Sequence, residues 1–463
     1  MTLIRSISGI RGTIGGKAGE GITPPDLVKY TAAFGTWIRL KSPSKKIVIV
    51  LGRDARISGE LCETIVSGTL TGLGINVVNL SLATTPTVEI AVQELKADAG
   101  IILTASHNPR QWNALKLLNA SGEFLSAQDG AKVLEIAEKG DFTFAEVDDL
   151  GKVTYNPGMG NLHIDRILQM PLVNCEAIRK AGFRVVIDCV NSVGGLVIPQ
   201  LLKELGVAEV VELYCDPTGE FPHNPEPLPQ HLGAISAAMK EHKADIGFVV
   251  DPDVDRLAII NEDGSMFGEE YTLVAVADYV LQHTPGNTVS NLSSTRALRD
   301  VTRQFGGSYH PAAVGEVNVV EAMKQVKAVI GGEGNGGVIY PPLHYGRDAL
   351  AGIALFLSHL ALSGKTGSAL RKTYPEYFIS KNRIDLTPDI DVDNVLALIR
   401  DKFSSYQVNN ADGVKIDFEK EWVHLRKSNT EPIIRIYAES ASEESANALA
   451  DRIIQEIKKG TRK

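Results

Sequence analysis

A serine and its neighbours could carry phosphate chemistry at one point of the sequence. The run TASHNP at residues 104–109 follows the apolar residues 100–103, which read as a buried strand. Because Asn-Pro favours a turn, we expect Ser106 at the carboxyl end of that strand, where its hydroxyl could act as a nucleophile or carry a transferred group. Taken alone, the run is equally typical of a polar turn that caps a helix.

Three aspartates form a second candidate in the run DPDVDR at residues 251–256, after the apolar residues 246–250. Carboxylates at every second position repel one another unless a hard cation neutralises them, and Mg²⁺ or Ca²⁺ with oxygen ligands is the expected occupant. An EF-hand is disfavoured because Arg256 stands where that loop needs glycine. The apolar strand before the run argues against a merely solvated acidic loop.

Two later segments have the residue types that bind sugars and phosphates. The run GEGNGG at residues 332–337 presents Glu333 and Asn335, whose side chains suit sugar hydroxyls. The run RKSNTEP at residues 426–432, with Arg435 beyond, offers guanidinium groups, hydroxyls and backbone amides for a phosphate monoester. Alone, the first would be a loose turn, whereas the flanking arginines favour an anion site in the second.

The composition excludes several classes of protein. The chain has 463 residues with a formal net charge of −9, so no basic surplus supports nucleic-acid or anionic-membrane binding. Four cysteines form no CxxC pair, and no signal peptide or membrane-spanning segment is visible, which predicts a soluble cytoplasmic protein. At about 150 residues per domain, the length suggests about three domains, with two to four plausible.

The elements that would position these segments alternate between helix and strand. Apolar spacing predicts a helix over 25–41, and continuous apolar runs predict buried strands. Because open α/β sheets bind ligands beyond the carboxyl ends of their strands, the polar loops are expected at one functional edge. Near the end, Val414, Ile416 and Phe418 alternate with Lys415, Asp417 and Glu419, as in a half-exposed antiparallel strand. The expected buried strands are residues 46–51, 76–80, 100–103, 184–188, 246–250 and 327–330, and a closing helix is expected over 442–459.

In this order, the serine, aspartate, sugar and phosphate segments resemble those of the α-D-phosphohexomutase superfamily, which includes phosphoglucomutase, phosphomannomutase and phosphoglucosamine mutase. The resemblance covers essentially the whole chain and takes in the runs SGIRG, FPH and VGE at residues 8–12, 221–223 and 314–316. It implies three similar α/β domains with mixed sheets plus a C-terminal α+β domain around a central cleft. The expected domains are residues 1–150 with the phosphoserine loop, 151–250 with the metal loop at the C-terminal end, 251–368 with the sugar-binding loop, and 369–463 with the phosphate-binding loop.

The same resemblance implies roles for individual residues. Ser106 would be a phosphoserine, and Asp251, Asp253 and Asp255 would hold Mg²⁺ together with a phosphoserine oxygen. A hexose 1,6-bisphosphate would be both intermediate and activator. The implied catalytic residues are Ser106, Arg11, His107 and Lys116, of which Lys116 is the first choice for handling protons, and the implied substrate-binding residues are Arg256, Gly315, Glu316, Glu333, Asn335, Arg426, Ser428, Asn429, Thr430 and Arg435.

The implied activity is that of a phosphohexomutase, an isomerase that interconverts hexose 6-phosphates and hexose 1-phosphates. Its partner would be a small-molecule sugar phosphate, with no nucleic acid or membrane, and the protein would be a monomer or homodimer. Departures from the commoner family pattern include Ala114 for glycine, Asn335 for serine, Gly337 for histidine and Asn429 for glycine. The asparagine variants favour phosphoglucosamine mutase, which converts glucosamine 6-phosphate to glucosamine 1-phosphate. Phosphomannomutase or phosphoglucomutase is the alternative.

A metal-dependent sugar phosphatase is a more remote alternative. Zinc phosphatases with a serine nucleophile generally need several histidine ligands, but the ten histidines of this chain are scattered. A non-catalytic sugar-phosphate sensor ranks last, because it should have lost Ser106 or one of the aspartates.

Overall fold

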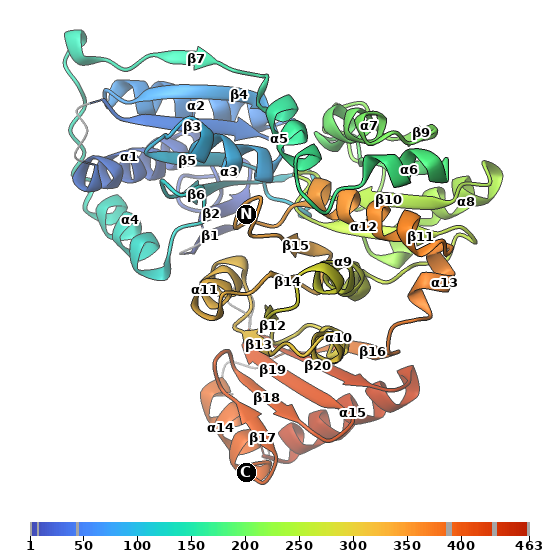
Figure 1. Ribbon diagram of the computed structural model, residues 1–463. Helices are drawn as coiled ribbons and strands as arrows, with labels where there is room; N and C mark the ends of the chain where they lie inside the picture. The colour runs from blue at the N-terminus through green and yellow to red at the C-terminus, as the bar shows by residue number, and fades with distance from the viewer. Residues whose placement is uncertain (1, 7–8, 43–45, 386–390, 428–432, 461–463) are drawn as a thin grey trace. The chain divides into compact units, whose positions relative to one another are not determined.

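A computed structural model describes residues 2–6, 9–42, 46–385, 391–427 and 433–460 (Figure 1). The chain divides into two compact units. The first holds Met1–Thr272 and Asn335–Arg371, and the second holds Leu273–Gly334 and Lys372–Lys463. The division falls within helix α9 (Glu269–His283) and within the GEGNGG run. Each unit has its own apolar core.

The first unit begins with a mixed seven-stranded sheet in the order β1-β2-β6-β5-β3-β4-β7. Ile49 and Leu51 of β3 lie in the core beneath α1, α2 and α4, whereas Val50 lies in the core beneath α3 and α5. Helices on both faces therefore explain why β3 is a continuous apolar run. The strands are β1 (Leu3–Ser6), β2 (Gly9–Thr13), β3 (Val48–Arg53), β4 (Asn76–Leu82), β5 (Ala99–Leu103), β6 (Trp112–Leu118) and β7 (Val153–Tyr155). The helices are α1 (Pro24–Lys41), α2 (Gly59–Gly72), α3 (Thr85–Glu94), α4 (Ala127–Lys139) and α5 (Met159–Leu168).

A second sheet of the first unit has the order β11-β10-β8-β9. Strand β10 is parallel to β8 and antiparallel to β11, so the aspartate run is the tight connection between β10 and β11. The elements are α6 (Cys175–Ala181), β8 (Arg184–Asp188), α7 (Gly194–Leu205), β9 (Glu209–Leu213), α8 (Gly233–Glu241), β10 (Ile246–Val250), β11 (Leu257–Asn261), β15 (Gly337–Ile339), α12 (Ala349–Ser363) and α13 (Gly367–Arg371), with 3₁₀ helices η1 (Val147–Asp149) and η2 (Pro229–His231).

The second unit contains two sheets. Strand β12 pairs in parallel with β13 and β14, and an antiparallel sheet has the order β16-β20-β19-β18-β17. Helices α14 and α15 cover one face of the antiparallel sheet (Figure 1). The α/β domains with mixed sheets and the C-terminal α+β domain expected from the sequence are thereby confirmed. The elements are β12 (Thr288–Asn291), α10 (Ala297–Gln304), β13 (Tyr309–Ala312), α11 (Glu316–Val326), β14 (Ile330–Glu333), β16 (Phe378–Asp385), α14 (Val392–Lys402), β17 (Gln407–Asn409), β18 (Val414–Asp417), β19 (Trp422–Lys427), β20 (Ile433–Ser440) and α15 (Glu443–Gly460).

The strand expected over 327–330 is wrong in position. Lys327 has a φ of +51° and ends α11, so the strand starts only at Ile330 and runs to Glu333. Glycine lets this strand approach its neighbours closely, because a Cβ on Gly331 would lie 2.5 Å from Sδ of Met323 and 2.8 Å from the Val289 carbonyl oxygen. Glu333 is therefore the last residue of a strand rather than part of a loose loop.

Lys415 is buried, although the alternation expected in β18 placed it on the exposed face of the strand. Its side chain is 5% exposed, and its Nζ lies 4.1 Å from the ring centroid of Trp422 and donates to the Leu292 carbonyl oxygen at 2.8 Å. Burial lowers the pKa of Lys415 to about 8. A long aliphatic stem and an aromatic neighbour thus allow a lysine where the pattern predicted an exposed position.

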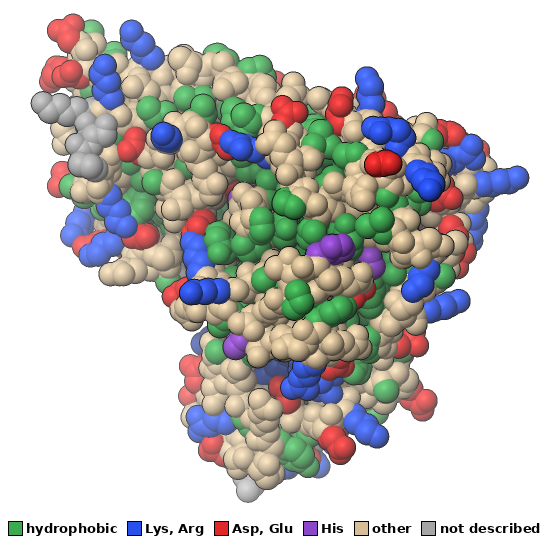
Figure 2. Space-filling model, in the orientation of Figure 1, with side chains coloured by type: hydrophobic (Ala, Val, Ile, Leu, Met, Phe, Trp, Pro, Cys, Tyr) green, Lys and Arg blue, Asp and Glu red, His purple; other side chains and the backbone are tan. Residues whose placement is uncertain are grey.

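Charge is distributed broadly over the surface. Figure 2 shows acidic and basic side chains interspersed over the face in view. Among the described helices, none combines the length and apolar character needed to cross a bilayer. The four cysteines are free thiols, in accord with the absence of a disulfide pattern in the sequence.

A buried charge network joins α3, α5 and the start of α12 in the first unit. Asp348 caps α12, and its Oδ2 lies 2.8 Å from Nε2 of His163 and 3.1 Å from Nε2 of His344. Nδ1 of His344 lies 3.2 Å from Glu89, and Nδ1 of His163 contacts the Thr87 hydroxyl at 3.0 Å. Although burial opposes the charge, the two carboxylates raise the pKa of His344 to about 10.

We therefore expect stability to fall as the pH rises above neutrality. A histidine whose pKa is higher in the folded than in the unfolded protein contributes fully below about pH 6.5, and its contribution is lost as the pH rises through about 10. Urea unfolding of the wild type between pH 6 and 10 should show a decline on the order of a few kcal/mol, and the decline should be smaller in His344→Gln. If the free energy of unfolding fell equally with pH in the wild type and in His344→Gln, this role of His344 would be contradicted.

Candidate active site

The serine loop begins directly after β5 in the first unit. Ser106 is 3% exposed and has a φ of +49°, a left-handed conformation that costs energy for a residue other than glycine. Its backbone N–H donates to the Thr104 hydroxyl at 2.9 Å, which in turn donates to Asp54 at 2.6 Å. The serine is therefore held at the strand end in a fixed turn.

Arg56 braces this turn and was missed as a site residue in the sequence. It is 1% exposed, and its Nε donates to Oδ2 of Asp54 at 2.9 Å. The rest of its guanidinium donates to successive carbonyl groups of the serine loop, so the loop is tied at several points to one rigid side chain. These carbonyl groups belong to Ser106, Asn108 at 2.9 Å, Pro109 at 2.9 Å and Trp112 at 3.1 Å.

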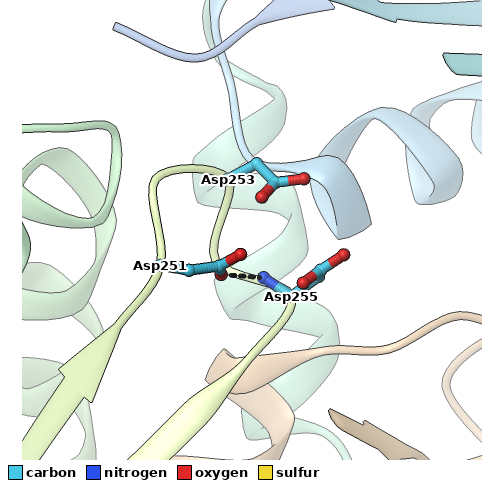
Figure 3. A group of neighbouring side chains, drawn as sticks. All are labelled: Asp251, Asp253 and Asp255. Carbon is cyan, nitrogen blue, oxygen red and sulfur yellow. Dashed lines mark hydrogen bonds between the residues drawn. The ribbon is translucent and has the colours of Figure 1, made fainter. Parts of the chain in front are cut away.

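The three aspartates point to one side of the turn between β10 and β11 (Figure 3). All three side chains are fully buried, and one oxygen of each lies within 4.8 Å of the others. The Ser106 hydroxyl donates to Oδ2 of Asp251 at 2.6 Å, which joins the serine and aspartate loops in one site. The other oxygen of Asp251 accepts backbone N–H groups of Asp255 and Arg256, each at 3.1 Å.

Side chains from other elements hold one oxygen of each remaining aspartate. Oδ2 of Asp253 accepts from Nζ of Lys116 at 2.6 Å and from the Thr85 hydroxyl at 2.6 Å. Oδ2 of Asp255 accepts from the Arg347 guanidinium at 2.8 Å, and Lys116 is 3.5 Å away. Each carboxylate is thereby fixed by one oxygen.

The second oxygens of Asp253 and Asp255 are buried and have no hydrogen-bond partner among the described residues. A buried carboxylate oxygen without a partner is costly, and a divalent cation with oxygen ligands would satisfy both at once. The residues present therefore fit a hard metal ion, with the Ser106 side chain beside it.

The charged neighbours in this cluster shift the pKa values of its aspartates in different directions. Burial and the charges of Asp255 and Asp253 raise the pKa of Asp251 well above its usual value. Although burial opposes ionisation of Asp253, the ammonium group of Lys116 lowers its pKa below the usual range. Burial likewise opposes the charge of Lys116, but Asp253 and Asp255 outweigh it and raise the pKa of the lysine. A bound cation would relieve the repulsion centred on Asp251.

The remaining predicted catalytic residues surround Ser106. Nδ1 of His107 is 3.4 Å from the Ser106 hydroxyl, and burial together with the charges of Arg256 and Arg11 lowers the histidine pKa well below 6.5. Arg11 donates to the side chain of Asn108 at 3.0 Å. The imidazole beside the Ser106 hydroxyl could handle a proton, and the guanidinium groups whose charges act on that imidazole could offset phosphate charge.

Predicted sugar-binding residues in the second unit form another connected group. Oε1 of Glu333 accepts from Nδ2 of Asn291 at 2.9 Å and from the backbone N–H of Gly315 at 3.1 Å. Glu316 follows as the first residue of α11 and is 7% exposed. The strand end of β14 thus meets the start of α11, which brings Gly315 and Glu316 to Glu333. Asn335 belongs to the first unit, where its side-chain oxygen accepts from the N–H of Gly337 at 3.3 Å.

The predicted phosphate-binding arginines lie on the antiparallel sheet of the second unit. Arg426 of β19 is directly opposite Arg435 of β20, which is opposite Arg383 of β16. Directly opposed residues on neighbouring strands share a face of the sheet, so three like charges form a row that an anion would stabilise. Arg426 also pairs with Asp412 at 3.1 Å, and Asp412 accepts from the N–H of Val314 at 3.0 Å. The other predicted residues here, Ser428, Asn429 and Thr430, lie outside the described residues.

Several residues of these clusters were not predicted from the sequence, among them Arg56, Thr85, Arg347 and Arg383. Thr85 is the first residue of α3, shortly after β4, and Arg56 lies in the turn after β3, so the strand-end rule that pointed to Ser106 could have found both. Arg347 and Arg383 gave no such signal, because their positions depend on how distant segments pack.

Four domain models of one family match the chain in sequence order. They describe the alpha/beta/alpha domains I, II and III and the C-terminal domain of phosphoglucomutase/phosphomannomutase, and they match residues 3–144, 161–264, 268–377 and 389–456. The chain belongs to the phosphoglucomutase/phosphomannomutase family. The superfamily suggested by the sequence motifs is thereby confirmed, whereas the domain boundaries drawn from the sequence stay a prediction.

Other members of the phosphoglucomutase/phosphomannomutase family match over their full length. A phosphoglucomutase/phosphomannomutase of Thermococcus kodakarensis is 35% identical and covers 97% of this chain and 99% of its own. A phosphoglucosamine/phosphogalactosamine mutase of Sulfurisphaera tokodaii is 30% identical over 96% of this chain and 97% of its own. A crystal structure of a family protein from Burkholderia thailandensis has a TM-score of 0.84 and 26% identity, covering 99% of this chain and 98% of that one. These relatives confirm the expected enzyme class, an isomerase.

Proposed function

We propose that this family member is a phosphohexomutase that moves a phosphoryl group between Ser106 and hexose phosphates. The observation that carries the proposal is the 2.6 Å hydrogen bond between the Ser106 hydroxyl and Asp251, inside a fully buried cluster of three carboxylates. Phosphoryl transfer needs in-line positioning and charge neutralisation more than other covalent chemistry, and this cluster supports both.

In the proposed reaction, phosphorylated Ser106 gives its phosphoryl group to the free hydroxyl of a hexose monophosphate. The bond from phosphorus to the serine oxygen breaks as the bond to the sugar oxygen forms, and the proton of that hydroxyl must leave. The resulting bisphosphate reorients, and its other phosphoryl group returns to Ser106. The product is the isomeric monophosphate.

Residues around Ser106 have separate tasks in this scheme. The guanidinium groups of Arg11 and Arg256 would offset the charge of the transferred group. The lowered pKa of His107 favours its neutral form close to the serine oxygen, which suits a proton acceptor, whereas two carboxylates raise the pKa of Lys116 and favour its charged form. The task of Lys116 would then be to donate a proton or to stabilise negative charge.

Mg²⁺ is the proposed metal, held by one oxygen each of Asp251, Asp253 and Asp255. When bound, it would neutralise phosphoryl oxygens during transfer. We expect a chelator to stop turnover, and added Mg²⁺ to restore it, in an assay that follows hexose 1-phosphate formation. Full activity in excess chelator would rule out the metal assignment.

A further set of residues would recognise the parts of the sugar phosphate that do not react. Arg426, Arg435 and the predicted loop residues Ser428, Asn429 and Thr430 would bind the remote phosphate. Glu333, Gly315, Glu316 and Asn335 would bind ring hydroxyls, a feature common to both orientations of the bisphosphate. The net charge of −9 supports a small-molecule partner rather than a nucleic acid or an anionic membrane.

We favour glucosamine phosphate as the substrate, with mannose or glucose phosphate as the alternative. The relatives include enzymes named for amino sugars and for glucose and mannose, and Asn335 and Asn429 support the first group. A ³¹P NMR assay with Mg²⁺ and a trace of hexose bisphosphate should compare glucosamine, glucose and mannose 6-phosphates. Fastest formation of glucosamine 1-phosphate is expected. Release of inorganic phosphate alone would contradict a mutase.

Glu333→Gln is expected to change sugar selection more than phosphoserine chemistry. The amide keeps the size of the side chain and one acceptor oxygen for Asn291 and Gly315, but it loses the charge that sugar hydroxyls would bind. We expect kcat/KM for the sugar phosphate to fall about 10–100-fold, with Ser106 still phosphorylated by added hexose bisphosphate. Loss of that phosphorylation, followed by mass spectrometry, would show that Glu333 serves the transfer itself.

A further inference from the structure

Arg347 is held beside the aspartate loop in two ways. Its side chain contacts the loop, and the residues that follow it in the chain form backbone hydrogen bonds there and nearby. The next residue, Asp348, donates its backbone N–H to the Val338 carbonyl oxygen at 2.8 Å. Ala349 donates to the carbonyl oxygen of Val254, at the centre of the aspartate loop, at 3.2 Å. Asp348 is further fixed by the buried histidine network, so the backbone that carries Arg347 has little freedom to shift.

The stem of Arg347 occupies the space beside Gly337. A Cβ built on Gly337 would lie 2.3 Å from Cδ and 2.9 Å from Cγ of Arg347, far inside any normal contact. Glycine at 337 therefore leaves the space that the Arg347 stem fills. Any side chain at 337 would displace the stem, and the guanidinium would move with it.

The guanidinium of Arg347 donates a hydrogen bond to one of the two carboxylate oxygens of Asp255. Its hydrogen bond to Oδ2 is 2.8 Å, much shorter than the 3.5 Å from Nζ of Lys116 to the same oxygen, whereas Oδ1 has no hydrogen-bond partner in the described parts of the chain. Asp255 can thus offer one oxygen to a cation, not two. This distinction matters because Mg²⁺ requires a compact octahedron, while Ca²⁺ accepts six to eight oxygens and often takes a carboxylate by both.

We propose that Arg347 is a positioning residue that restricts Asp255 to a single coordinating oxygen and so favours Mg²⁺ over Ca²⁺. The inference rests on the proposed metal site and deepens it. Without Arg347, Asp255 would turn both oxygens to the ion, and the larger cation would gain the additional bond.

Calorimetric titration of the metal-free full-length protein with MgCl₂ and with CaCl₂, in the absence of sugar phosphate, tests the proposal. Arg347→Met keeps the stem and removes the donors, and it should raise the ratio of Ca²⁺ to Mg²⁺ affinity about tenfold. Arg347→Lys keeps a charged donor and should stay within about threefold of the wild type. Arg166→Met is the matched control, because Arg166 pairs with Glu94 outside the aspartate cluster. An unchanged ratio in Arg347→Met would overturn the proposal.

A second variant tests the link to Gly337 without changing any charge. Gly337→Ala should raise the same ratio in the wild-type background by displacing the Arg347 stem. In an Arg347→Ala background the added methyl group has room, so Gly337→Ala should change the ratio less than about twofold. If the two substitutions changed the affinity ratio additively in the double variant, the proposed packing of the Arg347 stem against Gly337 would be refuted. These variants also provide a test if Arg347→Met fails to fold.

The titration separates this inference from the proposed function. If the wild type binds neither cation, both the metal site and the role of Arg347 are wrong. If the wild type binds Mg²⁺ and the ratio is the same in all variants, only the role of Arg347 is wrong.

Discussion

Ser106→Ala should lower the mutase rate at least about 10⁴-fold while sugar-phosphate affinity changes less than about threefold. In the proposed mechanism the variant lacks the oxygen that would carry the phosphoryl group, so neither half of the reaction could occur. Binding should persist because Arg56 holds the loop through the backbone carbonyl of residue 106, which alanine retains. The measurements are ³¹P NMR for turnover and calorimetry for binding.

Ser126→Ala is a suitable control for the Ser106 variant. Ser126 caps α4, and its contacts there are to Asp129, so this change tests the loss of a hydroxyl away from the cluster. The control should retain the wild-type rate. A Ser106→Ala enzyme with more than a trace of mutase activity would remove Ser106 from the mechanism.

Asp253→Ala should have the second largest effect, because it removes a proposed metal ligand and the nearest carboxylate of a buried lysine. The Nζ of Lys116 would keep only Asp255, which is 3.5 Å away. We expect a rate loss of at least about 10³-fold and a fall of roughly 3–5 kcal/mol in the free energy of unfolding. Activity assays and urea unfolding provide the two measurements.

A double variant separates the two roles of Asp253. Asp253→Ala with Lys116→Met removes the unpaired charge, so it should recover much of the stability but none of the activity. Asp263→Ala, in an exposed turn after β11, is the control and should match the wild type in rate. If Asp253→Ala retained full activity and bound Mg²⁺ normally, the aspartate loop would not be the metal site.

The sequence predicted the strands that carry the site because buried parallel strands have an unmistakable composition. Residues 184–188 and 246–250 form strands within the expected bounds, and Ser106 follows β5 as expected. The contact between Ser106 and Asp251 could not be measured from the sequence, since β5 and β10 belong to different sheets. The ends of predicted strands indicate which residues lie at the same edge of one sheet. They do not give the distance between the edges of two different sheets.

Residues that act on backbone groups or through packing were the ones that sequence reasoning missed. The strand-end rule could have pointed to Arg56, but its bonds to carbonyl groups could not be inferred from side-chain patterns, and Arg347 reaches Asp255 from 92 residues away. The misplaced strand at 327–330 has a similar cause, because a short apolar run fits a helix end as well as a strand. The left-handed Lys327 that ends α11 and the pairing of Ile330 with Thr288 of β12 distinguish the two.

The left-handed turn at Ser106 has a consequence for how the enzyme is first activated. A protein kinase needs its target hydroxyl on an accessible, extended segment, but Ser106 is buried and its loop is tied at four carbonyl groups. Under the proposed mechanism, the first phosphoryl group on Ser106 would therefore come from a small phosphate donor that enters the site. A newly synthesised molecule would stay inactive until it meets such a donor, so the supply of hexose bisphosphate would set the fraction of the enzyme that is active.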